Sequence, residues 1–331
     1  MSPERVTILG DGQMALVAAD ALTATGARVT LWGHDAADLD ALAGSRTSPR
    51  LEGFTLPETV VVEPDPRAAL RDAGVVVSAI PTQFLRAVWT PLAGMLPENT
   101  PVVSVTKGVE IKTLLTPTRV IADALGEPED RRAYAALSGP TIAHELARRL
   151  PATMVAASAH RDLAERVQCA FDAPWLRVYV SDDPLGVEIA GAVKNIIAIA
   201  SGICDGLALG NNARASLIAR GLVEMTRFVK HFGAKKSTFL GLSGAGDLFL
   251  TATSILSRNY RVGLGLAEVK ALERILEELG EVAEGVYTAE AVEKIVQKED
   301  IYTPIANEVY EILHGKDVRQ SLHDLLTNRR K

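Results

Sequence analysis

A short glycine-rich segment near the N-terminus constrains the fold of this chain more than any other feature. The apolar, β-branched residues 6–9 lead directly into Gly10-Asp11-Gly12-Gln13-Met14-Ala15, and an Ala- and Leu-rich helical run follows over residues 14–23. In a G-x-G-x-x-G/A segment the first glycine permits a tight turn, and the second lets backbone N–H groups approach a pyrophosphate. The small third residue lets helix and strand pack closely. Because the segment joins a strand to a helix, it predicts a dinucleotide-binding unit rather than a plain turn.

The rest of the first half continues this alternation of strand and helix patterns. Short apolar runs with turn residues nearby are predicted to be strands over residues 28–32, 59–62, 75–80 and 101–105. Strands that are apolar throughout and separated by helices are typical of parallel βαβ units covered on both faces.

The second half changes character at about residue 185. Long helical patterns, for example 187–201, 213–231 and 266–279, are separated by glycine-rich turns, and few strand signals remain. We therefore expect an α/β Rossmann-type N-terminal domain with a parallel-rich sheet over residues 1–184, followed by an all-α C-terminal domain over residues 185–331.

Composition excludes several classes of protein. The 331 residues carry a formal charge of −6, with 47% hydrophobic and 23% charged residues, which indicates an ordered globular chain without a basic nucleic-acid surface. The two cysteines cannot form a disulfide framework. His144-Glu145 lacks the second histidine of a zinc-protease helix, so we expect no metal site.

The longest apolar stretch, residues 190–210, is interpreted as a buried helix of a soluble protein. It contains Lys194, Asn195 and Asp205, which are costly at the centre of a bilayer. No basic-then-apolar signal region precedes residue 6, so the expected location is the cytoplasm.

The end of the second predicted strand does not decide between NAD and NADP. It reads Leu31-Trp32-Gly33-His34-Asp35, with no carboxylate at the strand end and no arginine following to hold a 2′-phosphate. Asp35 lies further along the chain, and His34 is charged only part of the time near neutral pH.

Lys194 is the most informative polar residue of the second half. Together with Asn195 it interrupts an otherwise apolar helix over residues 191–200, which predicts that it is buried or lines a cleft. A buried ammonium must be paired or must lower its pKa, and a lysine with a lowered pKa suits general acid–base chemistry on an alcohol. A structural ion pair with Asp247 or Asp205 is the alternative, and it is compatible with catalysis because a carboxylate would also orient the base.

Three further groups occupy places typical of ligand sites. Lys107 follows a predicted strand at the carboxyl edge of the sheet, where open α/β sheets bind ligands, although a solvated surface lysine is the simpler interpretation. Asp247 follows a glycine-rich turn and could instead cap a helix. Ser257-Arg258-Asn259 offers a hydroxyl, a guanidinium and an amide, which can bind phosphate or form an exposed turn.

In their order and spacing these segments resemble the soluble NAD(P)-dependent glycerol-3-phosphate dehydrogenase family over nearly the whole chain. The matching runs are residues 10–15, 80–83, 104–110, 137–145, 186–195, 241–248, 257–259 and 283–288.

The resemblance implies reversible hydride transfer between NAD(P)H and C2 of a three-carbon phosphate. Dihydroxyacetone phosphate would be reduced to sn-glycerol 3-phosphate, which feeds glycerophospholipid synthesis. The expected partners are this small phosphorylated substrate and a second copy of the chain in a homodimer, with no nucleic acid and no stable membrane insertion.

The resemblance also implies roles for individual residues. Lys194 would be the general acid/base for the C2 oxygen, Lys107 would contact substrate and cofactor, and Asp247 would orient Lys194. The implied substrate-binding residues are Lys107, Gly139, Thr141, Lys194, Asp247, Ser257, Arg258 and Asn259. The implied cofactor-binding residues are Gly10, Gly12, Gln13, Met14, His34, Lys107, Ala143, Arg258, Val282 and Glu284.

The chain departs from the family pattern at a few places. Gln13-Met14-Ala15 stands where Ser-Trp-Gly is usual, His34 where arginine is frequent, and Tyr260 where a second arginine is common. These departures concern cofactor choice and affinity more than the reaction.

Two other functions are compatible with the same fold. A related Rossmann-plus-helical dehydrogenase of another hydroxy or keto acid would need no phosphate-binding residues. A noncatalytic dinucleotide-binding regulator would need neither lysine nor Asp247.

Overall fold

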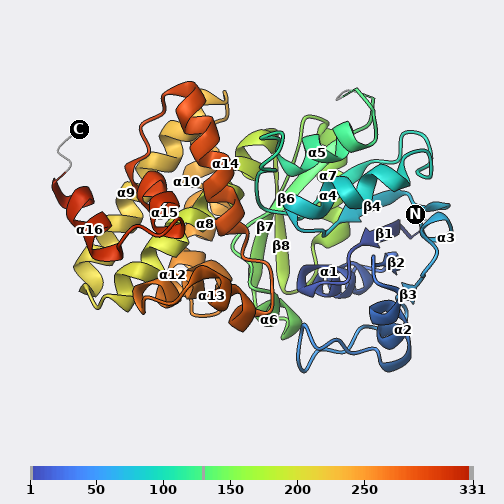
Figure 1. The fold of residues 1–331 in the computed structure, drawn as a ribbon. Coiled ribbons are helices and arrows are strands. Elements are labelled where there is room, and N and C mark those ends of the chain that lie inside the picture. The colour runs from blue at the N-terminus through green and yellow to red at the C-terminus, as the bar shows by residue number, and fades with distance from the viewer. Residues whose placement is uncertain (1–2, 129–130, 328–331) are drawn as a thin grey trace. The chain divides into compact units, whose positions relative to one another are not determined.

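The computed structural model describes residues 3–128 and 131–327, and the chain divides into two compact units (Figure 1). The first unit comprises Met1–Thr106 and Pro117–Pro184, and the second comprises Lys107–Thr116 and Leu185–Lys331. The segment Lys107–Thr116 belongs to the second unit because Val109 is buried in its hydrophobic core. The sequence analysis had placed this segment in the first domain.

The first unit is built on a single eight-stranded sheet with the order β3-β2-β1-β4-β5-β6-β7-β8. Neighbouring strands are parallel except for β6 and β7, which pair antiparallel. The strands are β1 (Arg5–Leu9), β2 (Arg28–Trp32), β3 (Val61–Val62), β4 (Val75–Ser78), β5 (Val102–Ser104), β6 (Tyr134–Ser138), β7 (Ala152–Ser158) and β8 (Leu176–Ser181).

Helices connect these strands and cover the sheet. They are α1 (Gln13–Ala24), α2 (Ala36–Ser45), α3 (Pro66–Leu70), α4 (Thr82–Trp89), the 3₁₀ turn η1 (Thr90–Leu92), α5 (Pro117–Ala124), α6 (Ala143–Ala147) and α7 (Arg161–Phe171). Helix α1 packs on β1 and β2, α5 on β5 and β6, and α7 on β7 and β8. Every residue of β4 is buried, as expected for a strand covered on both faces. The predicted α/β fold class with a parallel-rich sheet is confirmed.

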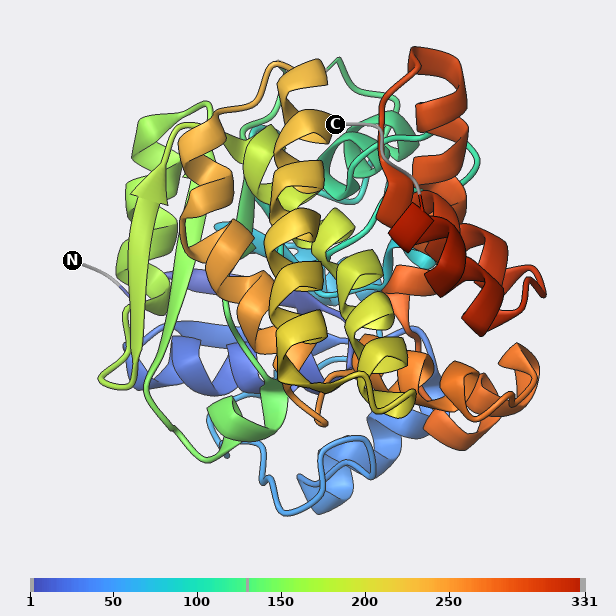
Figure 2. The same cartoon turned by 90° about the vertical axis from the view of Figure 1, so that its left-hand side faces the viewer.

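Over residues 185–327 the second unit is helical, and Figure 2 shows its helices in yellow to red. They are α8 (Pro184–Gly206), α9 (Gly210–His231), α10 (Lys236–Leu240), the π-helical turn η2 (Leu242–Gly246), α11 (Asp247–Thr253), α12 (Arg258–Ala267), α13 (Leu272–Leu279), α14 (Glu284–Glu299), α15 (Pro304–Leu313) and α16 (Val318–Thr327).

Helix α8 is the centre of this unit. By length and composition it could cross a membrane, but 94% of its most apolar window is buried inside the protein, as in the core helix of a globular domain. Two glycines bring α12 against it: a Cβ added at Gly263 would lie 2.0 Å from the carbonyl oxygen of Ile199, and one at Gly202 would lie 2.0 Å from that of Tyr260. This close approach fixes the start of α12 relative to α8.

The predicted helix over residues 266–279 is wrong. Helix α12 ends at Ala267 and α13 begins at Leu272. Between them Val269 is exposed and has a left-handed φ of 58°, which a continuous helix does not allow. The apolar periodicity continues across the break because Leu266 and Ile275, on either side of it, are buried in the same core. For that reason it predicts one helix where there are two.

Candidate functional site

The glycine loop of the first unit has the geometry that a pyrophosphate requires. Gly10 has a φ of 124°, and an added Cβ would lie 2.9 Å from the carbonyl oxygen of Ala79, so only glycine fits there. Gly12 is the N-cap of α1 and supplies no side-chain cap; a Cβ at Gly12 would meet nothing within 4 Å. The positive end of a long helix is therefore open to an anionic ligand, and the loop fits a dinucleotide.

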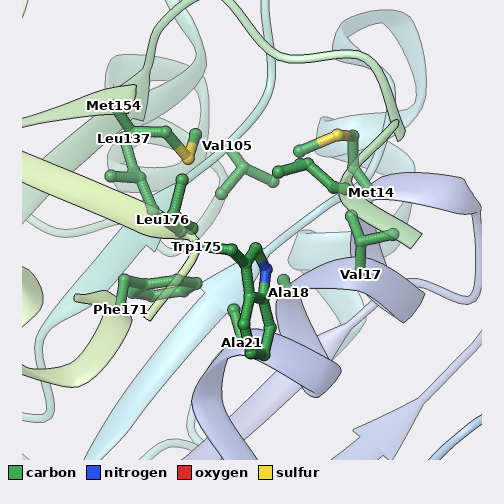
Figure 3. Close-up of a pocket in the computed structure, with 11 residues that line it drawn as sticks. Met14, Val17, Ala18, Ala21, Val105, Leu137, Met154, Phe171, Trp175 and Leu176 are labelled. Atoms are coloured by element: carbon green, nitrogen blue, oxygen red, sulfur yellow. The ribbon is translucent and has the colours of Figure 1, made fainter. Parts of the chain in front are cut away.

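The next two positions of the loop point to different environments. Met14 lines an apolar pocket together with Val17 of the same helix, Leu137 of β6 and Trp175 before β8 (Figure 3). Gln13 instead donates its side-chain amide to the carbonyl oxygen of Arg50, at 2.6 Å. Helix α1 is thus tied to the interior of the unit by Met14 and to the segment after α2 by Gln13.

A charged pair that the sequence does not reveal lies beside the end of β2. An added Cβ at Gly33 would lie 3.0 Å from Cγ of Asp11, so this loop carboxylate stands beside the strand end. Arg50 pairs through Nη1 with Asp11 at 2.7 Å and through Nη2 with Asp38 at 2.5 Å. His34 is exposed at the same strand end. No arginine directly follows the strand in the sequence, but the segment after α2 brings Arg50 to this place, where it pairs with Asp11 and Asp38.

Asp35 is the N-cap of α2. It accepts hydrogen bonds from the backbone N–H groups of Ala37 and Asp38 at 2.8 and 3.1 Å. Oδ1 of the carboxylate that follows β2 in the sequence therefore caps a helix terminus.

The predicted substrate residues of the first unit lie on the turn after β6. An added Cβ at Gly139 would be 2.6 Å from the carbonyl oxygen of Thr153, so this turn requires glycine. Thr141 donates its hydroxyl to the carbonyl oxygen of Gly139 at 3.3 Å, and Ala143 is the buried first residue of α6.

The second unit brings two lysines to one carboxylate. Nζ of Lys194 lies 2.8 Å from Oδ1 of Asp247, and Nζ of Lys107 lies 2.7 Å from Oδ2 of the same residue. Lys194 also donates to the hydroxyl of Thr251 at 2.6 Å, and that hydroxyl donates to the backbone carbonyl of Asp247 at 2.7 Å. We refer to Lys107, Lys194, Asp247 and Thr251 as the lysine cluster.

Local structure explains why Asp247 faces both lysines. It is the first residue of α11, directly after the π-helical turn η2, and the N-cap of α11 is Gly246, which provides no side-chain cap. The turn needs glycine, since a Cβ at Gly244 would lie 2.2 Å from the carbonyl oxygen of Phe239. The helix-capping alternative for Asp247 is wrong. Asp205, the other candidate partner of Lys194, bonds with Arg214 at 2.6 Å instead.

Burial and charge set the protonation of the cluster. Burial lowers the pKa of Lys194 to about 8; the carboxylate of Asp247 opposes this change, whereas the positive charge of Lys107 reinforces it. Burial alone would raise the pKa of Asp247, but the ammonium groups of Lys107 and Lys194 hold the pKa of this carboxyl below its usual value. At neutral pH the cluster is therefore an ionised carboxylate between two cations, one of which gives up its proton readily.

The Ser-Arg-Asn run begins α12 and contacts the start of α14. Ser257 caps α12 by accepting from the backbone N–H of Tyr260, and Oδ1 of Asn259 accepts from the N–H of Gly285 at 2.9 Å. Arg258 pairs with Glu281 at 3.2 Å. Val282 and Glu284, which lie next to Gly285, are partly buried. The residues of this unit that the family resemblance assigns to substrate (Ser257–Asn259) and to cofactor (Val282 and Glu284) therefore lie in one region.

These parts define the class of the protein. A glycine loop on the first strand of a parallel sheet and a buried lysine with a lowered pKa in a helical unit are features of a dinucleotide-dependent dehydrogenase.

Comparison with known proteins identifies the family. Residues 5–164 match the family described as NAD-dependent glycerol-3-phosphate dehydrogenase N-terminus, and residues 183–323 match the corresponding C-terminus. This chain belongs to the NAD-dependent glycerol-3-phosphate dehydrogenase family.

Individual relatives agree with this assignment. A glycerol-3-phosphate dehydrogenase (NAD(P)+) of Solidesulfovibrio magneticus is 41% identical over 325 residues, 98% of each chain. One of Nitratiruptor sp. is 57% identical over 220 residues, 66% of this chain and 72% of the relative. The crystal structure of glycerol-3-phosphate dehydrogenase from Coxiella burnetii superposes with a TM-score of 0.93 at 35% identity, covering 98% of this chain and 99% of that one.

Proposed function

We propose that this chain catalyses the reversible NAD(P)H-dependent reduction of dihydroxyacetone phosphate to sn-glycerol 3-phosphate, a precursor of glycerophospholipids. Family membership and the names of the relatives support the reaction. The observation that carries the assignment of residues is the lysine cluster, in which two ammonium groups share one buried carboxylate.

The cluster provides the proton and the positive charge that the reduction requires. NAD(P)H, when bound, supplies the hydride that adds to C2. As negative charge develops on the C2 oxygen, protonated Lys194 donates a proton to it and the ammonium of Lys107 stabilises the charge. In the opposite direction, neutral Lys194 accepts the proton of the alcohol. Asp247 orients both side chains, and its bond to Lys194 is supported by Thr251.

The substrate phosphate is assigned to the start of α12. Arg258 and Asn259 offer a guanidinium and an amide for charge-assisted hydrogen bonds, and Ser257 precedes them. Gly139 and Thr141 of the first unit complete the proposed substrate residues. Binding energy from the phosphate, which does not react, would hold C2 in position for hydride transfer.

The two units divide the work in this proposal. Residues 1–184 bind the dinucleotide through Gly10, Gly12, Gln13, Met14, His34 and Ala143, and residues 185–331 supply Arg258, Val282 and Glu284, with Lys107 acting from the segment that packs in the second unit. We also propose that the enzyme is a cytoplasmic homodimer without stable membrane insertion.

The test is a direct assay of the purified protein. Dihydroxyacetone phosphate is added in parallel to NADH and to NADPH, and the loss of absorbance of the reduced cofactor is followed. Oxidation of either cofactor that depends on the substrate is expected. If neither is oxidised while both still bind by fluorescence, the proposed reaction is wrong.

The variant Arg258→Ala distinguishes the proposed function from that of a related dehydrogenase acting on another hydroxy or keto acid. The proposed function expects a rise in KM for dihydroxyacetone phosphate of about tenfold or more, because the variant loses a charged hydrogen bond to phosphate. An unchanged KM, or faster turnover of an unphosphorylated keto acid by the unaltered protein, would favour the other dehydrogenase.

A further inference from the structure

The adenosine end of the glycine loop carries charges that bear on the choice between NADH and NADPH. In folds of this kind a carboxylate near the end of β2 accepts hydrogen bonds from the ribose of NAD, whereas an arginine accommodates the 2′-phosphate of NADP. The carboxylate that follows β2 here, Asp35, is bonded to the backbone of α2. The strand end itself is Gly33.

Asp11 supplies a carboxylate at that place from a different part of the sequence. It lies between the two glycines of the loop, and its Cγ would be 3.0 Å from a Cβ at Gly33. Its side chain is 19% exposed, so it is mostly buried but still partly accessible. The absent side chain of Gly33 therefore leaves room for a carboxylate that reaches the strand end from the loop.

Arg50 is held between two carboxylates at the same place. Its guanidinium bonds with Asp11 through one terminal nitrogen and with Asp38 through the other, and Gln13 anchors its backbone carbonyl oxygen. The three side chains together carry a net charge of −1, from two carboxylates and one guanidinium. A 2′-phosphate dianion would have to compete with both carboxylates for Arg50 and would be repelled by them, whereas a ribose diol can donate to Asp11.

We propose that Asp11 and Arg50 set the cofactor preference of this enzyme, with Asp11 accepting the hydrogen bond of the NADH ribose while Asp11 and Asp38 withhold Arg50 from the 2′-phosphate of NADPH. The inference rests on the proposed function only in taking the glycine loop as the dinucleotide site. It predicts that the enzyme binds NADH more tightly than NADPH.

Equilibrium binding of each cofactor in the absence of substrate tests the proposal. The fluorescence of NADH and of NADPH is titrated against the unaltered protein, D11N, D38N and the matched control D40N, which removes an exposed carboxylate from the same helix. The unaltered protein is expected to bind NADH about tenfold more tightly than NADPH. D11N should weaken NADH binding and strengthen NADPH binding, so that the ratio shifts by about tenfold or more, and D40N should leave it unchanged.

D38N tests the same proposal without changing a residue of the glycine loop, in case D11N disturbs that loop. It releases Arg50 from one side without altering the glycine loop, so the ratio should shift toward NADPH by about threefold. Tighter binding of NADPH than NADH by the unaltered protein, or a ratio that neither D11N nor D38N changes, would overturn the proposal. Because no dihydroxyacetone phosphate is present, an enzyme inactive on that substrate would refute the proposed reaction and leave this result intact.

Discussion

The glycine loop of the first unit and the lysine cluster of the second place different demands on the sequence. The loop requires room and a permitted φ at Gly10, and a buried alanine occupies its third position. The cluster acts through side-chain atoms of defined charge on α8 and α11 and on the segment containing Lys107. The loop therefore depends first on glycine at defined positions, and the cluster depends on the charge of its side chains.

The largest difference between the glycine loop and the lysine cluster is expected for Lys194→Met. Methionine has a side chain of similar length that can stay buried, but it lacks the ammonium group. Without the proton donor, kcat should fall by about 10³-fold or more, while the affinity for NAD(P)H should change little because the glycine loop is untouched. Stopped-flow turnover and cofactor fluorescence measure the two effects separately. A variant with near-normal kcat would remove Lys194 from the proposed role.

The pH dependence of the two reaction directions reports the same group. Since the pKa of Lys194 is lowered to about 8, the ammonium needed for reduction is present below that pH and is lost above it. The reduction rate should therefore fall by about tenfold per pH unit above pH 8, and oxidation of glycerol 3-phosphate should rise with pH and level off there. Removing the neighbouring positive charge with Lys107→Met should move the profile to higher pH, besides lowering the rate. An unchanged pH profile in this variant would show that the charge of Lys107 does not lower the pKa of Lys194.

The backbone site is tested by a pair of glycine substitutions. Gly10→Ala introduces a Cβ 2.9 Å from a carbonyl oxygen at a positive φ, so it should destabilise the fold by about 1–3 kcal/mol and weaken cofactor binding. Gly12→Ala meets no protein atom within 4 Å and should leave stability nearly unchanged while it obstructs the approach of the pyrophosphate. Chemical denaturation and cofactor titration distinguish the two variants. Equal losses of stability would contradict the difference in local packing.

His34→Arg should have the smallest effect. An arginine at this exposed position at the end of β2 would add a charge near the ribose and raise the NADPH/NADH ratio by about threefold. Parallel Kd measurements check this. An unchanged ratio would place residue 34 away from the adenosine ribose.

The sequence predicts most of the fold because the evidence for it is local. Strand and helix patterns alternate along the first half, and apolar periodicity indicates the helices of the second. The same periodicity fails at Val269, where two helices bury one continuous apolar side in a common core. Lys194 stands out because an ammonium in an apolar helix has few physical explanations.

Tertiary contacts are what the sequence does not reveal. The pairing of Lys107 with Asp247 joins residues 140 positions apart, and nothing in their spacing distinguishes Asp247 from Asp205 as the partner of Lys194. Arg50 was overlooked because its contact with Asp11 depends on the path of the loop after α2, which no local pattern encodes.

The segment Lys107–Thr116 has a consequence for how the enzyme is made. During synthesis Lys107 leaves the ribosome long before α8 and α11, and Val109 has no core to enter until those helices follow. A chain that ends between residues 16 and 246 contains the complete glycine loop but lacks the carboxylate that both lysines share. In the proposed mechanism, acid–base chemistry therefore has to wait for synthesis to reach Asp247, whereas the loop proposed to bind the dinucleotide is complete at Ala15.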